Sequence, residues 1–448
     1  MKEILFAYQS YNNEFDCYNP NACPSDWVIH GKKIIPYTHG PQFFTWESLN
    51  YDYVSADRMS YEKIISMGAQ PSKQEYLVDL VDLKLLDDIP AGQKYIYHIS
   101  VHRTTFFRLN TNFGFDFISP RVIQDVKNKI AKIVILFPYE GNTGILTTHL
   151  FLNNGALMVD EWCKKAGLDK TQVYFIHGNL LADSFDSIVT NYTSVAVDAF
   201  STWVPNRYMS SELTVPKFQP VDDKNLYLCY NRNVRIHRRF LLSMLMHHGV
   251  FNRGLISCGD TQGGEQRFSY ELSNYNQSYL IPAAKEVCKL APIELDQNLK
   301  INNPASDIHE IHYDNTFISL ISETQFEEGI LFRSEKIYKT LAVGHPFIVF
   351  SCSGFLKSLK ELGFKTFDPW IDESYDNEPD WITRLNMITN EIKKLSLYNI
   401  DKLHEIRDEM QEVLIHNKML FRQIYMRNLR YNRNTPLYEA VKKVWRSF

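Results

Sequence analysis

The chain has 448 residues and a formal net charge of −4, with 44% hydrophobic and 22% charged residues. A single hydrophobic core rarely grows to this length, so we expect two or three domains of an ordinary globular protein. The near balance of charges provides no overall field that attracts nucleic acid or an anionic membrane, which argues against a protein that binds either through its whole surface.

The cysteines and the apolar runs bear on where the protein works. Seven Cys are scattered without a Cys-x-x-Cys pair, which indicates reduced thiols rather than disulfides or a zinc finger. The first residues include Glu3 and turn polar by Gln9, so they predict a strand rather than a signal peptide. The longest apolar run, around residues 346–356, is shorter than the roughly 18 residues of a membrane span. We therefore expect a cytoplasmic protein that does not enter a membrane.

The first half of the chain alternates short apolar runs with helical stretches. Residues 3–7, 95–101, 132–137 and 173–178 predict strands, while 122–130 and 157–166 predict helices. Such alternation is typical of a doubly wound α/β domain. A polar segment with two prolines, residues 213–224, then interrupts the pattern and predicts a domain linker, because its prolines exclude a helix.

The alternation resumes after this linker. We expect strands at 225–231, 254–258, 316–322, 347–350 and 364–367, and helices at 236–248, 281–290, 334–343 and 354–362. From residue 381 to about 427, Ile, Leu and Met recur with the helical period, and a basic tail follows. The sequence therefore predicts an α/β protein of two Rossmann-like domains, at 1–215 and 225–380, followed by C-terminal helices at 381–448.

Basic residues gather where the first strand of the second domain meets its helix. Arg232, Arg235, Arg238 and Arg239 surround the expected helix start, together with His237. A diphosphate there would meet unpaired backbone N–H groups and guanidinium groups, whereas cations without an anion oppose the helix dipole. We expect Arg232 and Arg235 to bind phosphate. Arg238 and Arg239 are adjacent and cannot both face the ligand. The alternative is a solvated basic first turn.

A second cluster follows strand 316–322. Glu323 stands where that strand ends, and Ser334 is placed to cap the next helix, with Glu335 and Lys336 in its first turn. A carboxylate there can accept hydrogen bonds from sugar or ribose hydroxyls, and Lys336 can neutralise a phosphate. The alternative is a capped helix with an ordinary Glu–Lys surface pair.

The pair Glu335-Lys336, with Gly344 and Pro346 further on, resembles the donor-binding motif of the α1,3-fucosyltransferases, in which Glu-Lys on a helix is followed by Gly and Pro-Val-Val. Glu323 is the candidate equivalent of the Glu in the Phe-Glu-Asn triplet of that family. The resemblance implies the GT-B glycosyltransferase architecture, two Rossmann-like domains facing across a cleft. It also implies a nucleotide-sugar donor held by the second domain.

A second likeness and two departures from the family motif accompany this resemblance. Residues 345–350 and 359–368 also look like a group of phage and large-virus glycosyltransferase-like proteins, and the likeness as a whole covers roughly residues 225–380. The family triplet reads Ser-Glu-Thr at 322–324, and His345 replaces a small residue before the proline. The resemblance therefore does not carry over fucose as the sugar.

The acceptor side is expected in the first domain. Strand 132–137 ends shortly before Glu140. The fucosyltransferases place a general-base Glu after a comparable strand, so the resemblance implies Glu140 as the base that deprotonates the acceptor hydroxyl. A loop-capping role for Glu140 is the alternative, and His39, His102 and Asp116 are rival bases. Aromatic residues at 43–46 and 102–108 predict either an acceptor-stacking wall or ordinary core.

The sequence also bears on metal ions, cofactors and the acceptor of the expected reaction. The sequence contains no Asp-x-Asp triplet and no dense Asp/His cluster, so we expect no metal and no cofactor, with the nucleotide-sugar as co-substrate. If the fucosyltransferase likeness extends to mechanism, the reaction inverts the anomeric centre. The viral likeness and the basic tail favour a hydroxymethylated base in phage DNA as acceptor, in the host cytoplasm. The alternatives are a glycan or protein acceptor and, from another class, a non-catalytic protein that binds a nucleotide or glycan.

Overall fold

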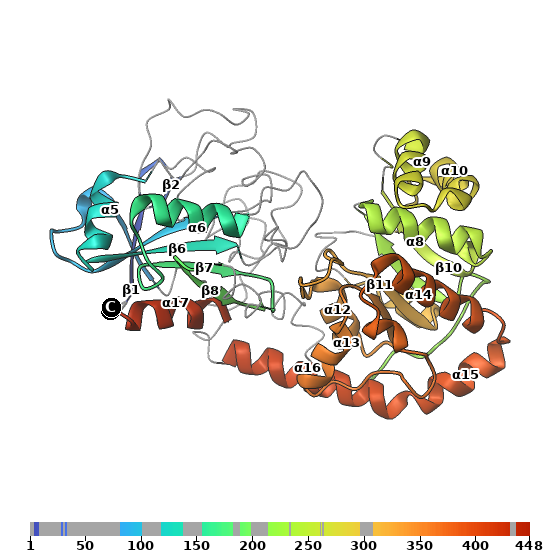
Figure 1. The fold of residues 1–448 in the computed structure, drawn as a ribbon. Helices are drawn as coiled ribbons and strands as arrows, with labels where there is room; N and C mark the ends of the chain where they lie inside the picture. Colours follow the sequence, from blue (N-terminus) through green and yellow to red (C-terminus); the bar gives the residue numbers. More distant parts are fainter. Residues whose placement is uncertain are drawn as a thin grey trace. The chain divides into compact units, whose positions relative to one another are not determined.

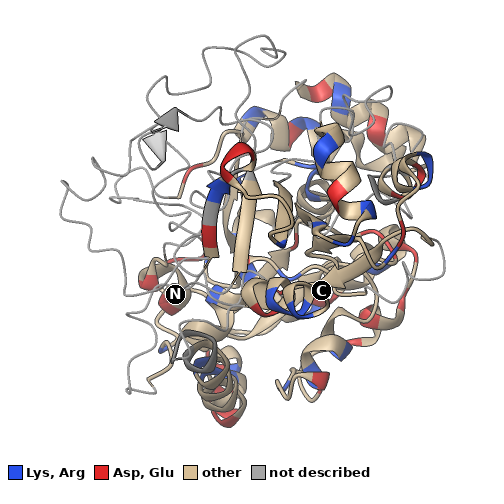
Figure 2. Cartoon of the chain, turned by 90° about the vertical axis from the view of Figure 1, so that its left-hand side faces the viewer, with Lys and Arg blue, Asp and Glu red and all other residues tan. Residues whose placement is uncertain are grey.

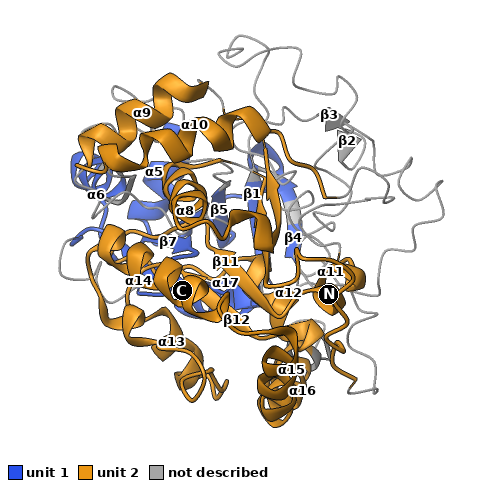
Figure 3. Ribbon diagram, turned by 90° about the vertical axis from the view of Figure 1, so that its right-hand side faces the viewer, with its two compact units in different colours: residues 1–203, 302–306, 426–448 blue, residues 204–301, 307–425 orange. Residues whose placement is uncertain are grey.

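The structure is a computed structural model. It describes residues 4–8, 28–29, 32–33, 81–100, 118–137, 155–181, 189–198, 214–232, 234–259, 261, 264–295, 308–430 and 436–448. The chain forms two compact units, shown in Figure 3. Unit 1 comprises Met1–Trp203, Asn302–Ser306 and Met426–Phe448, and unit 2 comprises Val204–Ile301 and Asp307–Tyr425.

Unit 1 is built on a parallel sheet with the strand order β4-β1-β5-β6-β7-β8. The bounds of these strands are β1 Ile4–Tyr8, β4 Val81–Leu85, β5 Tyr95–Ser100, β6 Ala131–Phe137, β7 Val173–His177 and β8 Thr193–Ala196. A short antiparallel pair, β2 Val28–Ile29 and β3 Lys32–Lys33, lies outside this sheet. The 3-10 helix η4 covers Leu86–Asp88.

Helices cover both faces of this sheet (Figure 1). Helices α5, Pro120–Lys127, and α6, Gly155–Ala166, contribute Val122, Val159 and Trp162 to one apolar cluster. Helix α17, Pro436–Arg446, contributes Val441 and Val444 to a second cluster with side chains of β1, β5 and β6. Burial of these apolar faces joins the last helix of the chain to its first domain.

Unit 2 contains a second parallel sheet with the strand order β10-β9-β11-β12. Its strands are β9 Tyr227–Asn231, β10 Gly254–Cys258, β11 Ile318–Ser322 and β12 Phe347–Phe350. Its helices are α8 Ile236–His247, η7 Phe251–Arg253, α9 Gly264–Asn274, η8 Ser278–Leu280, α10 Ile281–Leu290, α11 Glu310–Asn315, α12 Glu335–Val343, α13 Phe355–Glu361, η9 Ser374–Asn377, α14 Trp381–Leu395 and α15 Ile400–Glu409. Helix α16, Gln411–Arg430, begins in unit 2, and its residues from Met426 on belong to unit 1.

The α/β class with two parallel sheets is confirmed, and most expected elements begin and end within a few residues of those observed. The expected division at 1–215, 225–380 and 381–448 differs from the compact units, because the boundary falls between Trp203 and Val204. Helices α14 and α15 belong to unit 2, whereas α17 belongs to unit 1. An arrangement in which the two units face across a cleft stays a prediction.

The strand expected at 364–367 is wrong, because this segment pairs with side chains instead of a neighbouring strand. The Asn417 side chain accepts from the backbone N–H of Lys365 at 2.8 Å and donates to its carbonyl at 2.8 Å. The N–H of Phe367 donates to the Glu373 carboxylate at 2.6 Å. With these groups occupied, the segment has no regular secondary structure and lies against Asn417 of α16.

None of the described helices combines the length and apolar character that a bilayer-crossing helix needs.

Candidate functional site

The strand order of unit 2 creates a site at the carboxyl edge of its sheet. The chain leaves β9 through α8 toward β10 on one side, and it leaves β11 through α12 toward β12 on the other. Ligands of open parallel sheets bind where such connections diverge. The register pairs Ser319 with Leu228 and, continued along both strands, sets Ser322 beside Asn231 at this edge. The amino termini of α8 and α12 follow these two strand ends.

The start of α8 is basic and lacks a side-chain cap. Its N-cap residue is Arg235, whose backbone is extended and whose side chain makes no capping hydrogen bond. Arg235 instead donates from Nη1 to the carbonyl of Thr324 at 3.3 Å, which brings its guanidinium to the end of β11. Arg232 is exposed and follows β9 directly. An anion at this helix start would meet backbone N–H groups and both arginines.

Gly259, at the end of β10, is packed tightly against this same turn. A Cβ at position 259 would lie 1.9 Å from the carbonyl oxygen of Arg232. The N–H of Gly259 donates to the carbonyl of Asn231 at 3.2 Å. Only glycine permits this approach, so the three residues fix the path of the chain out of β9.

The adjacent arginines of α8 point in different directions, as their positions on the helix require. Arg238 is buried and donates from Nη2 to the carbonyls of Ser322, at 3.1 Å, and Glu323, at 3.4 Å. Burial, and then the nearby charge of Arg235, lower the pKa of Arg238 to about 10. Arg239 forms a paired salt bridge with Glu271 of α9. Arg238 therefore belongs to the site, although sequence reasoning left open which of the two faces it.

His237, which the sequence places at the helix start without assigning it a role, also belongs to the site. Burial, followed by the charges of Arg238 and Arg235, holds the pKa of His237 well below its usual value, so the ring is neutral. Its Nε2 lies 2.9 Å from the carbonyl oxygen of Glu323, which only an N–H can bond. Its Nδ1 is then an acceptor, and within the described residues it has no hydrogen-bond partner.

Glu323 links the two strand ends to α12. Its carboxylate is fully buried and accepts from the N–H groups of Thr324 and Ser334, each at 3.2 Å. Burial raises the pKa of Glu323, and the charge of Lys336 opposes that rise. Two backbone groups already occupy this carboxylate, so its expected contact with ligand hydroxyls stays a prediction.

The start of α12 has the cap that the sequence predicts. Ser334 is the N-cap and accepts from the N–H of Lys336 at 3.2 Å. The Lys336 ammonium lies 3.1 Å from Glu335 Oε1, 3.1 Å from Ser334 Oγ and 3.5 Å from Thr324 Oγ1. Burial raises the pKa of Glu335, but the charges of Lys336 and Lys339 outweigh it, so the net shift is downward and Glu335 is ionised.

Positive charge exceeds negative charge at this edge. The cations of Arg235, Arg238, Lys336 and Lys339 and the carboxylates of Glu323 and Glu335 lie close enough here to shift one another's pKa values or that of His237. The positive ends of α8 and α12 add to this excess. Cations at helix starts are unfavourable without an anion, so this arrangement is chemically suited to hold one.

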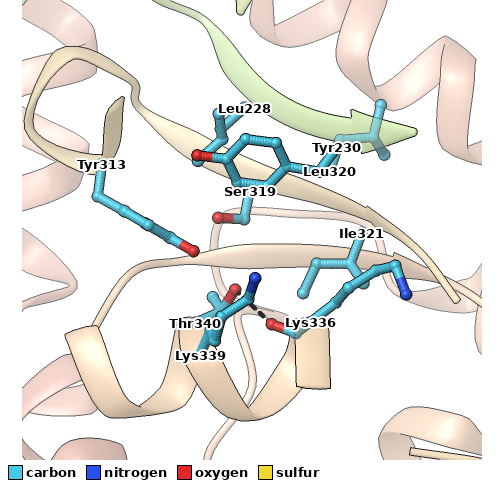
Figure 4. Close-up of a pocket in the computed structure, with 9 residues that line it drawn as sticks. All are labelled: Leu228, Tyr230, Tyr313, Ser319, Leu320, Ile321, Lys336, Lys339 and Thr340. Carbon is cyan, nitrogen blue, oxygen red and sulfur yellow. Dashed lines mark hydrogen bonds between the residues drawn. The ribbon is translucent and has the colours of Figure 1, made fainter. Parts of the chain in front are cut away.

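A small hollow lies between α12 and the strands β9 and β11. It is lined by side chains of β9, β11, α11 and α12, among them Tyr230, Tyr313, Lys336 and Lys339 (Figure 4). Its volume is about 20 Å³, which suits one water-sized molecule. The Lys339 ammonium lies 5.8 Å from the centre of the Tyr230 ring. A nucleotide does not fit this hollow, and Arg235 at the start of α8 does not line it.

The structure brings together Arg235, Glu323, Glu335 and Lys336, with exposed Arg232 on the adjoining turn. Glu140 and its rivals His39, His102 and Asp116 lie outside the described residues. Within those residues no group of His, Cys, Asp and Glu is arranged to hold a metal ion.

No family model matches the chain, and no curated protein matches it. Among solved structures, an alpha,alpha-trehalose-phosphate synthase (UDP-forming) from Burkholderia vietnamiensis is 8% identical over 68% of each chain, with a TM-score of 0.29. A glycosyltransferase from Rickettsia africae ESF-5 is 13% identical over 76% of this chain and 98% of that chain, also with a TM-score of 0.29. At this TM-score neither structure indicates the function of this chain, so the functional conclusion depends on the residues of the site.

Proposed function

We propose that the protein is a glycosyltransferase and that unit 2 binds the pyrophosphate of a nucleotide-sugar donor. The observation that carries this proposal is the meeting of two helix amino termini with Arg235, Arg238 and Lys336 at the switch point of a parallel sheet. That position takes nucleotide phosphates in open α/β sheets. The charge excess there matches a polyanion rather than a neutral ligand.

The chain's own residues have separate roles in this proposal. Lys336 and Arg235 neutralise the diphosphate as the bond to the sugar breaks, which stabilises the leaving group without requiring a metal ion. Arg232, which is exposed on the adjoining turn, is a further contact to the pyrophosphate. Glu335, ionised and 17% exposed, accepts hydrogen bonds from sugar or ribose hydroxyls. Glu140 takes the proton of the acceptor hydroxyl, and the anomeric centre is inverted.

For the acceptor we propose a hydroxymethylated base in DNA, with a glycan or protein as the alternative. A base within a duplex would have to be flipped out for this reaction. Figure 2 shows Lys and Arg interspersed with Asp and Glu along the described helices that face the viewer, which favours an acceptor held by local contacts over one held by a uniformly basic surface.

A thermal-shift panel tests the proposal. The full chain is heated with UDP, GDP, CMP or ADP, and one nucleotide is expected to raise the melting temperature, since a ligand that binds the native state stabilises it by mass action. Incubation with the matching nucleotide-sugars is expected to release nucleotide slowly. Tight binding without any release indicates a non-catalytic nucleotide-binding protein, and absence of any shift contradicts the proposal.

A further inference from the structure

One buried arginine of α14 ties down the loop that carries the site. Residues 323–334 run from the end of β11 to the cap of α12. Arg384 is 1% exposed. It donates from Nη2 to the Phe326 carbonyl at 2.9 Å and from Nη1 to Glu328 Oε1 at 2.8 Å. The same Nη1 also donates to the carbonyl of Glu378, just before α14. A single guanidinium therefore joins the middle of the loop to the start of a C-terminal helix.

Neighbouring contacts extend this attachment on both sides of the loop. The Glu328 carboxylate also accepts from the N–H of Ser353, after β12, at 2.9 Å. The Phe326 ring lies 4.4 Å from the His237 ring and 5.1 Å from the Trp381 ring, measured between centroids. The loop is thus held between the start of α8 and the start of α14.

We propose that Arg384 is a positioning residue for the anion site, an inference that rests on the proposed function of unit 2. Arg384 acts through the loop: its bonds hold Phe326 and Glu328, which lie two and four residues after Thr324. Thr324 in turn meets Arg235 through its carbonyl and Lys336 through its hydroxyl. If the loop is less ordered, the side chains of these two cations adopt many conformations. Diphosphate binding then has to overcome the conformational entropy lost when they become ordered.

The chain contains a matched control for this arginine. Arg407 of α15 is also buried, at 2% exposed. It donates to the carbonyls of Phe317, at 2.9 Å, and Pro216, at 3.4 Å. Phe317 precedes β11, so this contact is at the amino edge of the sheet, at the opposite end of β11 from the site. Loss of Arg407 removes a buried cation of the same kind without touching the loop.

The test measures nucleoside diphosphate binding by calorimetry in the full chain, with UDP and GDP as probes. The variants are Arg384→Met, Arg384→Lys, Arg407→Met and Lys336→Met, at a temperature where circular dichroism shows each folded. We expect Arg384→Met to weaken binding about tenfold, the range seen for residues that act through a neighbour. Arg384→Lys should recover part of the loss. Arg407→Met should bind as the wild type does while melting at a lower temperature.

Hydrogen exchange distinguishes a local loosening of the loop from general destabilisation, because a general effect would speed exchange in both arginine variants. Amides of residues 323–334 should exchange faster in Arg384→Lys and keep their wild-type rates in Arg407→Met. If Arg384→Met does not fold, Glu328→Gln replaces it, because that change weakens the same attachment and leaves both carbonyl contacts of Arg384. It should weaken diphosphate binding relative to both the wild type and Arg407→Met.

The outcomes distinguish the role of Arg384 from the proposed function of unit 2. Equal affinity in the wild type and in every folded loop variant, together with loss in Lys336→Met, overturns the role of Arg384 and leaves the proposed function intact. Failure of the wild type to bind either diphosphate overturns the inference for these probes, and failure with the whole nucleotide panel overturns the proposed function as well.

Discussion

The starts of α8 and α12 meet at one sheet edge but are built differently. Helix α12 has a serine cap, an acidic residue in its first turn and a buried carboxylate that accepts from its N-cap N–H. Helix α8 has an arginine at its cap, no side-chain capping bond and no acid in its first turn. The first backbone N–H groups of α12 therefore have acceptors within the protein, whereas those of α8 are left for an external anion. The difference indicates that α12 sets the geometry and α8 supplies much of the attraction.

The largest expected effect comes from removing the carboxylate that braces α12. Glu323→Ala leaves the N–H groups of Thr324 and Ser334 buried without their acceptor, so we expect a loss of about 3 kcal/mol of unfolding free energy. Denaturant titration measures it. Glu265→Ala is the control, because Glu265 forms an exposed pair with Lys285, and such a pair contributes less than about 1 kcal/mol. Equal losses in the two variants would contradict the bracing role.

Next in size is the loss of the ammonium group at the start of α12. Lys336→Met removes a charged partner of the diphosphate, and a hydrogen bond to a charged group contributes about 1.5–3 kcal/mol. We therefore expect nucleoside diphosphate affinity to fall at least about tenfold. Calorimetry measures this, with Lys285→Met on α10 as the matched lysine. The role assigned to Lys336 is excluded if both variants bind alike.

A cap exchanged into α8 tests the comparison from the other side. Arg235→Ser provides the serine cap that α8 lacks and removes the guanidinium beside Thr324. The new cap should raise the free energy of unfolding by about 1 kcal/mol. Loss of the hydrogen bond to the Thr324 carbonyl should lower it by a similar amount, so stability should change little. Affinity for the diphosphate should fall about tenfold, as for one charged contact. Thermal melting with and without nucleotide measures both quantities, and an unchanged ligand-induced shift would be inconsistent with an anion site at α8.

The reverse change at α12 should act on stability alone. Ser334→Ala removes the cap that accepts from Lys336 N–H, which costs about 1 kcal/mol. The Lys336 ammonium keeps its pairing with Glu335, so diphosphate affinity at a temperature where the variant is folded should stay within about threefold. Parallel denaturation and calorimetry test this. A larger loss of affinity than of stability would show that α12 binds the anion through its cap.

The smallest expected effect is a dependence of stability on pH. The charges of Lys336 and Lys339 lower the pKa of Glu335 in the folded state despite its burial. The unfolded chain then binds more protons, so this contribution is present above the unfolded pKa of about 4.3 and is lost as pH falls through the folded value. Glu335→Gln should differ from the wild type near neutral pH and converge with it on acidification. Parallel stability curves across this range would contradict the assignment.

Glu323 should titrate with the opposite sign. Burial raises its folded pKa, so the native state binds more protons than the unfolded chain and its ionisation costs stability as pH rises through the folded value. Comparison of Glu323→Gln with the wild type over the same pH range separates the two carboxylates.

Much of unit 2 is predictable from sequence because its strands are short, largely apolar runs between clear helix signals. Strands β10 and β12 begin and end where the sequence places them, and so does α10. The Ser334 cap and the Glu335-Lys336 turn follow from local chemistry alone. These features depend on neighbours in the chain, which a sequence displays.

The missed elements depend on distant partners. Strands β4 and β8 lie at the two ends of the unit 1 sheet order, and β4 includes Asp82 and Lys84, charges that suit an edge strand and hide its pattern. The strand expected at 364–367 failed because Asn417 and Glu373 occupy its backbone groups. His237 and Arg238 enter the site because α8 turns them toward the end of β11, which no local motif reveals.

A crystal structure of the full chain with a bound nucleoside diphosphate tests the central claim most directly. The account predicts the pyrophosphate within hydrogen-bond distance of the Lys336 ammonium and the Arg235 guanidinium, against the first turn of α8. A diphosphate bound elsewhere, with this edge filled only by solvent, would contradict it.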